Sequence, residues 1–295
     1  MSMRQQFVNS TEEILRDDPK TVLLLGDIGV FGFRNAFERF PTRVYNIGIL
    51  EQATIGLAAG LALEGCIPIV HTIAPFLVER AFEQLKIDFG YQQLGGNFVS
   101  AGASYDYAAL GCTHHCPGDV GILLNLPGME IVVPGTSHEF ARLLHASYDN
   151  GHSTYFRLSE QENESSFAVE FGKGAVIREG NLATVIAVGP VLSTVMAACS
   201  DMDITILYYT CINPIDTDLL LHHCSSGKVL FCEPYFSGGI AYSLLSEIPC
   251  TFAKVDAVGV PHKFLRKYGT KKEQDETAGL TPENIRIRIE RLIDE

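Results

Sequence analysis

The sequence predicts an α/β protein of two domains, each with a mainly parallel sheet flanked by helices. Short apolar runs alternate along the chain with longer amphipathic stretches, as in strands that are joined by helices. A chain of 295 residues is long enough for about two cores of ordinary size. The polar, acidic segment 159–167 interrupts the alternation. We therefore expect a first domain over residues 1–160, a linker over 161–172 and a second domain over 173–295.

In the first domain, strands are expected where apolar residues run without charge, and helices where they recur every three to four positions. The expected strands cover residues 21–25, 43–47, 67–71, 97–101, 130–133 and 154–158. The expected helices cover residues 35–40, 50–64, 77–91, 119–126 and 137–148. A long loop rich in glycine, alanine and tyrosine spans residues 102–113, and such a loop inside a compact domain is more often functional than idle.

The alternation resumes after the linker. The expected strands cover residues 182–188, 204–208, 229–232 and 251–257, and the expected helices cover 191–199, 216–222 and 239–247. Thr281 and Pro282 open a last helix, because threonine is a good cap and proline suits the first helical position.

Composition excludes several classes of function. The net charge of −13 leaves no basic stripe for nucleic acid. The N-terminus lacks the apolar run of a signal peptide, and no segment is apolar and long enough to span a bilayer. The eight cysteines include no C-x-x-C pair, which suits free thiols in a reducing compartment. We expect a cytoplasmic protein without nucleic-acid or membrane partners.

Glu51 is the most informative residue of the sequence. Between residues 44 and 63 only Tyr45 and Glu51 are ionisable. A carboxylate left unpaired in such an apolar stretch costs roughly several kcal/mol. An acidic residue in the first turn of a helix gains about 0.3–1 kcal/mol from the helix dipole, which is too little to explain its place. A buried carboxylate that keeps a proton, or shares one with a ligand nitrogen, fits better.

Two further motifs invite a metal interpretation, and we favour neither. Residues 26–29, Gly-Asp-Ile-Gly, match the opening of a diphosphate-metal site, but the Asn-Asn pair that such a site needs is absent, so a turn after a strand is favoured. Residues 112–116, Cys-Thr-His-His-Cys, contain zinc-ligand types, but adjacent ligands rarely reach one tetrahedron. Residues 222–224 could complete such a set only if the two domains met there. A histidine at the end of a glycine-rich loop is better suited to hydrogen bonding or proton transfer.

Four motifs in the first domain occur in an order that is typical of one family. They are Asn46-x-Gly-Ile-x-Glu51-Gln52, Phe76-x-x-x-Arg80-Ala-Phe82-Glu-Gln84, Gly111-x-Thr-His114-His115 and Leu126-Pro-Gly-Met-x-Ile-Val-Val-Pro134. Together they resemble the pyrimidine-binding domain of transketolase and its relatives, deoxyxylulose-phosphate synthase and the beta subunits of 2-oxo acid dehydrogenases. The second domain is similar to theirs through Ile212-Asn-Pro214-Ile-Asp216 and Glu233-Pro-Tyr-Phe-Ser-Gly238-Gly239.

The resemblance implies a function for each candidate residue. In the family, the glutamate that matches Glu51 hydrogen-bonds a ring nitrogen in the aminopyrimidine of thiamine diphosphate. Phe76 matches the aromatic residue that packs on this ring, although a core phenylalanine is the alternative. His114 matches a histidine that faces the substrate. Asp27 and Ile28 fall where a loop of the family approaches the thiazolium ring. The implied reaction moves a two-carbon unit from a ketose to an aldehyde.

The resemblance also implies a partner. The diphosphate-binding domain of the family would precede residue 1, so this chain resembles the C-terminal half of a split transketolase. A separate N-terminal subunit would hold the diphosphate with Mg²⁺ or Ca²⁺. Homodimerisation of each half would give a heterotetramer with its active sites between subunits.

The sequence departs from the family where sugars are recognised. Ile73 replaces a second aromatic residue, Leu110 replaces an acid that reads a sugar hydroxyl, and a histidine expected upstream falls near Gly102. Glu160 stands where an arginine would hold a sugar phosphate, and a negative charge repels phosphate. We expect an unphosphorylated or modified sugar. The alternatives are a 2-oxo acid dehydrogenase beta subunit, a deoxyxylulose-phosphate-synthase-like enzyme and a non-catalytic binding module.

Overall fold

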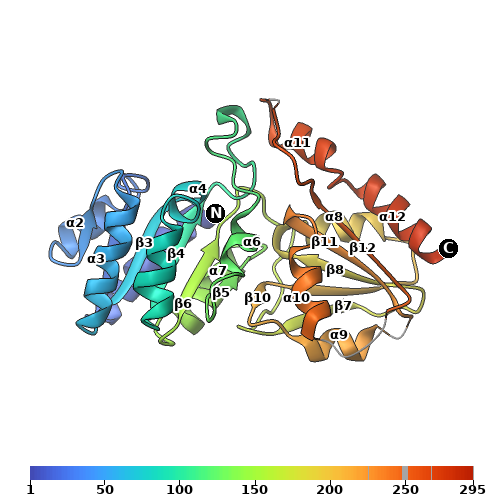
Figure 1. Ribbon diagram of the computed structural model, residues 1–295, viewed down its shortest axis with the longest axis horizontal. Helices are drawn as coiled ribbons and strands as arrows, with labels where there is room; N and C mark the ends of the chain where they lie inside the picture. The colour runs from blue at the N-terminus through green and yellow to red at the C-terminus, as the bar shows by residue number, and fades with distance from the viewer. Residues whose placement is uncertain (225, 248–251, 267, 295) are drawn as a thin grey trace.

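The first sheet has seven strands in the order β10-β5-β6-β4-β3-β1-β2. The structure of the chain is a computed structural model (Figure 1), and it describes residues 1–295 apart from 225, 248–251, 267 and 295. The strands are β1 (Thr21–Leu25), β2 (Val44–Asn46), β3 (Ile67–Ile73), β4 (Gly96–Ala101), β5 (Glu130–Val132), β6 (Ser153–Arg157) and β10 (Cys211–Asn213). All pairings are parallel except that of β10 with β5.

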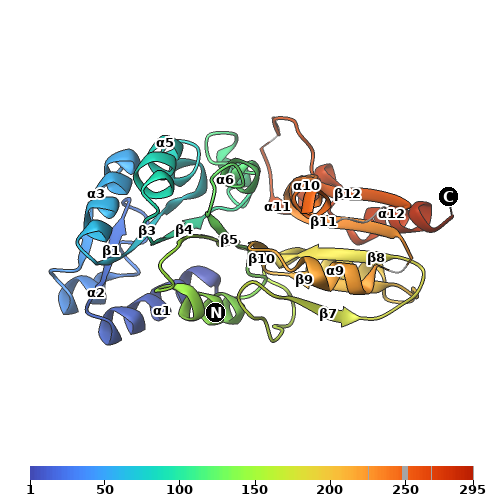
Figure 2. The ribbon, with the colours of Figure 1, turned by 60° about the horizontal axis from the view of Figure 1, so that its bottom comes forward.

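Helices cover both faces of this sheet (Figure 2). One face packs against α1 (Met3–Asp17), α2 (Arg34–Arg39) and α7 (Ser137–Ser147). The other carries α3 (Glu51–Leu63), α4 (Ala74–Leu77), α5 (Phe82–Gln84), the π-helix η1 (Leu85–Tyr91) and α6 (Asp119–Leu123). Alternate strand residues serve the two faces, since Leu23 and Leu25 join the first cluster and Val22 and Leu24 the second. None of the described helices is long and apolar enough to cross a membrane.

Helix α1 was not expected from the sequence. The side chain of Ser2 accepts a hydrogen bond from the backbone of Gln5 and caps the helix. Met3, Phe7 and Ile14 are buried, and the helix packs against α7. Its apolar spacing is helical, but polar residues dominate the segment and obscure the pattern.

The second sheet has the order β12-β11-β8-β9-β7. Its strands are β7 (Gly174–Arg178), β8 (Thr184–Val188), β9 (Thr205–Tyr209), β11 (Lys228–Phe236) and β12 (Lys254–Val260), and only β7 is antiparallel to its neighbour. Its helices are α8 (Leu192–Ala198), α9 (Thr217–His223), α10 (Gly239–Glu247), α11 (Lys271–Ala278) and α12 (Pro282–Asp294). The start expected for the last strand, residue 251, lies outside the described residues. The predicted fold class, two mainly parallel sheets flanked by helices, is confirmed.

The continuous helix expected over residues 77–91 is wrong. The chain forms α4, leaves helical structure near Val78 and re-forms as α5 and η1. The backbone N–H groups of Glu79 and Arg80 both donate to the carbonyl of Pro75, so Arg80 lies in the turn between the two helices. The residues predicted for the apolar face are buried on both sides of the break, as Leu77 and Phe89 show. A π-helix is wider than an α-helix and occurs mostly near functional sites.

The thermal stability of the fold should depend on pH through His71. This side chain lies in β3, its Nδ1 donates to the carbonyl of Val99 over 2.8 Å and its ring packs on Phe7. Burial lowers the pKa of His71 to about 4. An unfolded chain titrates near pH 6.5, so the stabilisation is complete at neutral pH and is lost as pH falls from about 6.5 to 4, by up to about 3 kcal/mol.

We expect His71→Phe to show a shallower loss of melting temperature than the wild type between pH 7.5 and 4.5. Thermal unfolding followed by circular dichroism at several pH values would measure both slopes. Equal slopes would show that His71 does not set this pH dependence.

Candidate active site

The candidate residues gather at the carboxyl edge of the first sheet. Asp27 follows β1, Glu51 follows β2, and Phe76 follows β3. The loop 102–118, in which His114 lies, follows β4. The parallel register brings these strand ends level, because Leu25 pairs with both Asn46 and His71. This edge is where open α/β sheets bind ligands.

Glu51 is the first residue of α3, and its side chain is 3 % exposed. Its Oε2 accepts a hydrogen bond from Nη1 of Arg80 over 2.9 Å. Its Oε1 is buried and has no hydrogen-bond partner within the described part of the chain. Buried polar atoms are nearly always hydrogen-bonded, so an orphaned oxygen at a sheet edge indicates a place for a ligand.

Arg80 compensates the buried carboxylate, a function that the sequence analysis did not assign. Its guanidinium lies 4.2 Å from the ring centroid of Phe76 and is 40 % exposed. One arginine therefore joins Glu51 to Phe76 by an ion pair and a cation–π contact. Arg80 belonged to a quoted motif, but the expected unbroken helix concealed the direction of its side chain.

His114 lies beside Phe76. The two ring centroids are 5.4 Å apart with the rings edge to face, and the ring centroid of Tyr107 lies 6.3 Å from that of His114. Thr113 Oγ1 and His114 Nδ1 are 2.9 Å apart. Gly111, at φ +74°, makes the turn from which the loop returns toward His114. The structure thus brings Glu51, Phe76 and His114 into one continuous group.

The neighbouring His115 differs from His114. It is buried, and this burial lowers its pKa, so the ring stays neutral near pH 7. Among the described residues, no group of three or more histidine, cysteine, aspartate or glutamate side chains is arranged to hold a metal ion.

Asp27 and Ile28 lie at the same edge without touching that group through polar contacts. Asn46 holds the loop, because its Oδ1 accepts from the backbone N–H of Asp27 over 3.0 Å and its Nδ2 donates to Asp27 Oδ1 over 3.2 Å. Asp27 adopts φ +68°, which such side-chain bonding supports. Within the described residues, no hydrogen bond or ion pair joins Asp27 to Glu51 or His114.

A pocket of about 340 Å³ opens where β4 and β6 end. Gly102, Ser159 and Glu160 line one side of it, and Ser2 and Arg4 from the start of α1 line the other. Arg4 and Glu160 give this pocket one positive and one negative side chain. Arg4 was not predicted as a site residue, because helix α1 was not predicted.

Comparison with known proteins identifies the family of the chain. Residues 1–165 match the family model "Transketolase, pyrimidine binding domain". The chain is 38 % identical over 283 residues to the "Uncharacterized 33.6 kDa protein in fasciation locus" of Rhodococcoides fascians, covering 95 % of this chain and 91 % of that protein. It is 27 % identical over 299 residues to an apulose-4-phosphate transketolase subunit of Phocaeicola vulgatus, covering 92 % and 95 %.

Among solved structures, the one described as "Split gene transketolase, inactive beta4 tetramer" superposes with a TM-score of 0.86 at 25 % identity, and the match covers 99 % of this chain and 98 % of that one. The family match spans more than half of the chain. The chain therefore belongs to the transketolase family, and its first 165 residues form the pyrimidine-binding domain.

Proposed function

We propose that this chain is the C-terminal half of a thiamine-diphosphate-dependent transketolase that moves a two-carbon ketol unit from a ketose to an aldehyde. The observation that carries the proposal is the orphaned Oε1 of Glu51, buried beside the partly exposed ring of Phe76. A flat heteroaromatic ring with a nitrogen at its edge fits both features, since it can pack on Phe76 and pair with the orphaned oxygen.

Each residue of the site has a chemical function in this proposal. Glu51 holds or shares a proton at Oε1, and Arg80 fixes the carboxylate through Oε2. Phe76 supplies the ring face, and the apolar residues of α3 exclude water and so strengthen the hydrogen bond to Glu51. When bound, thiamine diphosphate supplies the carbon that carries the two-carbon unit between donor and acceptor. His114 binds or protonates the sugar oxygen that faces it.

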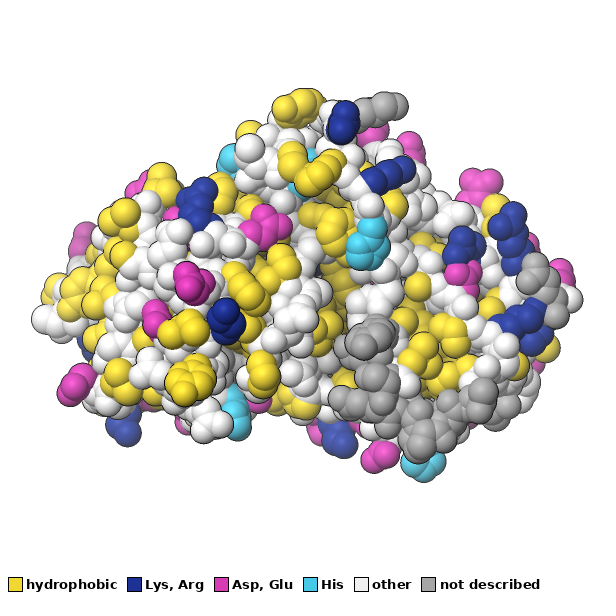
Figure 3. Space-filling view, in the orientation of Figure 1, with side chains coloured by type: hydrophobic (Ala, Val, Ile, Leu, Met, Phe, Trp, Pro, Cys, Tyr) yellow, Lys and Arg dark blue, Asp and Glu magenta, His cyan; other side chains and the backbone are white. Residues whose placement is uncertain are grey.

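The diphosphate end of the cofactor and its Mg²⁺ or Ca²⁺ would belong to an N-terminal subunit. An apolar surface beside Glu51 supports this partner. It consists of exposed hydrophobic side chains on and around α3 and η1, namely Phe31, Ile49, Leu50, Leu57, Leu63, Ile87 and Tyr91. Hydrophobic atoms gather over α2 and α3 in Figure 3. A helix that is apolar all round is normally buried, whereas one side of α3 is exposed.

We propose that the N-terminal subunit covers this surface, that Asp27 and Ile28 contact the cofactor there, and that two copies of each half assemble.

We take the pocket lined by Arg4 and Glu160 as the site of the sugar, and its charges favour a sugar without a phosphate. A phosphate carries about −1.5 to −2 charges at pH 7. Glu160 and Arg4 line the same pocket, so their charges offset each other and leave no net attraction for that group. Leu110 is exposed on the adjoining loop and offers no acid to a sugar hydroxyl.

Replacing Glu51 tests the central step. We expect Glu51→Gln to lower ketol transfer by the complex with the N-terminal subunit at least about 100-fold, because the amide cannot exchange a proton as the carboxyl group does. Glu64→Gln, at the exposed far end of α3, is the matched control and should keep full activity. Full activity in Glu51→Gln would favour the non-catalytic binding module. Activity with lipoamide in place of an aldehyde would favour an oxo acid dehydrogenase.

Replacing Leu57 tests the partner surface. Leu57 lies in α3 and is 46 % exposed, so Leu57→Glu should leave the melting temperature of the isolated chain nearly unchanged. It should weaken binding to the N-terminal subunit at least about ten-fold, because a charge would be buried at the contact. Leu182→Glu, at 47 % exposure in the second domain, is the control. Analytical ultracentrifugation would measure the complexes. If Leu57→Glu and Leu182→Glu bound the N-terminal subunit equally well, the contact would lie elsewhere.

Replacing Glu160 tests the substrate. The wild-type complex should prefer free aldoses over phosphorylated ones. Glu160→Arg should raise kcat/KM for the phosphorylated aldose by about ten-fold or more, since it removes the charge that offsets Arg4 and adds a second positive charge to the pocket. Steady-state kinetics with matched pairs of sugars would measure this, with Glu164→Arg as an exposed control. A wild-type preference for pentose phosphates would contradict the proposed substrate.

A further inference from the structure

The loop 102–118, in which His114 lies, is anchored by three consecutive residues at its start. Ser104, Tyr105 and Asp106 each make polar contacts with a different part of the molecule. Ser104 adopts φ +49°, a left-handed conformation that costs energy in a residue other than glycine. Such a conformation persists only where its surroundings hold it.

The second domain holds Ser104 in place. The Ser104 hydroxyl donates to the backbone carbonyl of Pro234 in β11 and accepts from Nη2 of Arg157 over 2.7 Å. Asp106, the third anchor, accepts from the backbone N–H of Glu160 over 2.9 Å. The first and third anchors therefore fix the loop between β11 and the end of β6.

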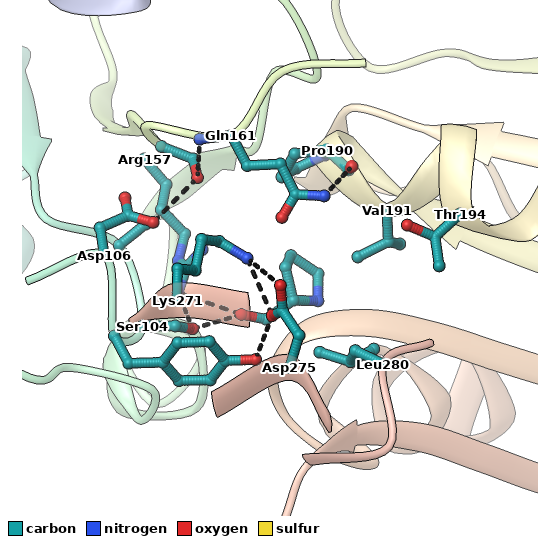
Figure 4. A pocket seen from close by; sticks show the side chains of 14 residues that line it. Ser104, Asp106, Arg157, Gln161, Pro190, Val191, Thr194, Lys271, Asp275 and Leu280 are labelled. Carbon is teal, nitrogen blue, oxygen red and sulfur yellow. Dashed lines mark hydrogen bonds and ion pairs between the residues drawn. The ribbon is translucent and has the colours of Figure 1, made fainter. Parts of the chain in front are cut away.

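Tyr105 reaches the second domain through its phenol. The hydroxyl donates to Asp275 Oδ1 over 2.6 Å, and Nζ of Lys271 lies 2.8 Å from both oxygens of the same carboxylate (Figure 4). Lys271 and Asp275 are one turn apart on α11, whose start is fixed by a capping box at Thr270. Burial and the Asp275 carboxylate raise the pKa of Tyr105, so the phenol keeps its proton and remains the donor.

The end of the loop is held by the same domain. The backbone N–H of Phe236 donates to the carbonyl of Pro117 over 2.8 Å, and the backbone of Cys116 donates to Ser104 over 2.7 Å, which closes the base of the loop. The ring of Tyr268 lies so close to Gly111 that a Cβ added there would meet it at 2.5 Å. In Figure 1 the loop and the segment before α11 rise side by side.

We propose that the second domain positions the substrate-facing loop, and that Tyr105 and Asp275 are the positioning residues that couple α11 to His114. This inference rests on the proposed function in one respect, namely that the loop contacts the acceptor sugar. A loop of this length would lose much conformational entropy on binding a sugar, and anchoring it in advance removes part of that cost. Tyr105 does not touch the reacting atoms, so its effect reaches the sugar through the loop.

The hydrogen bond can be removed from either side. Tyr105→Phe deletes the donor, and Asp275→Leu deletes the acceptor. Asp275→Asn weakens the charge pairing with Lys271 but keeps an oxygen that can accept from the phenol, so it should rescue much of the effect. Tyr209→Phe is the matched control, because this buried phenol also loses one hydrogen bond, to the carbonyl of Asp216 over 2.8 Å, away from the loop.

The first readout, hydrogen exchange followed by mass spectrometry on the full chain, does not depend on any activity. Peptides within residues 107–116 should exchange about ten-fold faster in Tyr105→Phe and Asp275→Leu and near the wild-type rate in Asp275→Asn and Tyr209→Phe. The second readout is kinetic and uses the complex with the N-terminal subunit. The KM for the acceptor should rise about five-fold or more in the first two variants, with little change in the affinity for thiamine diphosphate.

Wild-type exchange in the loop of Tyr105→Phe would overturn the proposal. Faster exchange with an unchanged KM and kcat would overturn it as well, because the anchor would then be structural only. A complex without ketol transfer would contradict the proposed function, whereas the exchange measurement would still decide whether the second domain positions the loop.

Discussion

A fully buried ion pair between Arg157 and Asp119 supports the site and the junction between the domains. Nε of Arg157 lies 2.7 Å from Asp119 Oδ2, and the side chains are 1 % and 0 % exposed. The phenol of Tyr155 donates to the same oxygen, and the guanidinium also reaches Ser104. Such a pair is stable only while both partners and their hydrogen bonds are present, and removing one partner costs about 3–5 kcal/mol. The end of β6, the start of α6 and the base of the loop are therefore fixed by one set of charges.

The carboxyl edge of the first sheet presents two different surfaces. Glu51 and Phe76 lie on the side of α3, where the exterior is apolar and one carboxylate oxygen lacks a partner within the described residues. Arg4 and Glu160 lie on the side of α1, where a pocket with one positive and one negative side chain opens. In the proposed function the first surface receives the cofactor and the N-terminal subunit, and the second receives the sugar. The loop that contains His114 lies between them, and both domains hold it.

The sequence predicts those features of the protein that depend on a local pattern of residues. The absence of other charges around Glu51 predicted its burial, and the alternation of apolar runs predicted both sheets. The site residues that could not be predicted from the sequence depend on contacts between segments that are far apart in the chain. Arg80 reaches Glu51 only because the helix breaks near Val78. Tyr105 and Asp275 are 170 positions apart, and the antiparallel addition of β10 to the first sheet depends on the packing of the two domains. The functions assigned to Glu51, Phe76, His114, Asp27 and Ile28 all stay predictions.

The most direct test of the central claim is a titration of thiamine diphosphate into this chain alone and into the complex that it forms with a chain carrying the diphosphate-metal motif. Isothermal titration calorimetry in the presence of Mg²⁺ would measure both. We predict no saturable binding to the isolated chain and one saturable site per chain in the complex, because in the proposed function Glu51 and Phe76 contact only the pyrimidine end. Tight binding by the isolated chain, or the absence of binding by the complex, would contradict the division of the active site between two subunits.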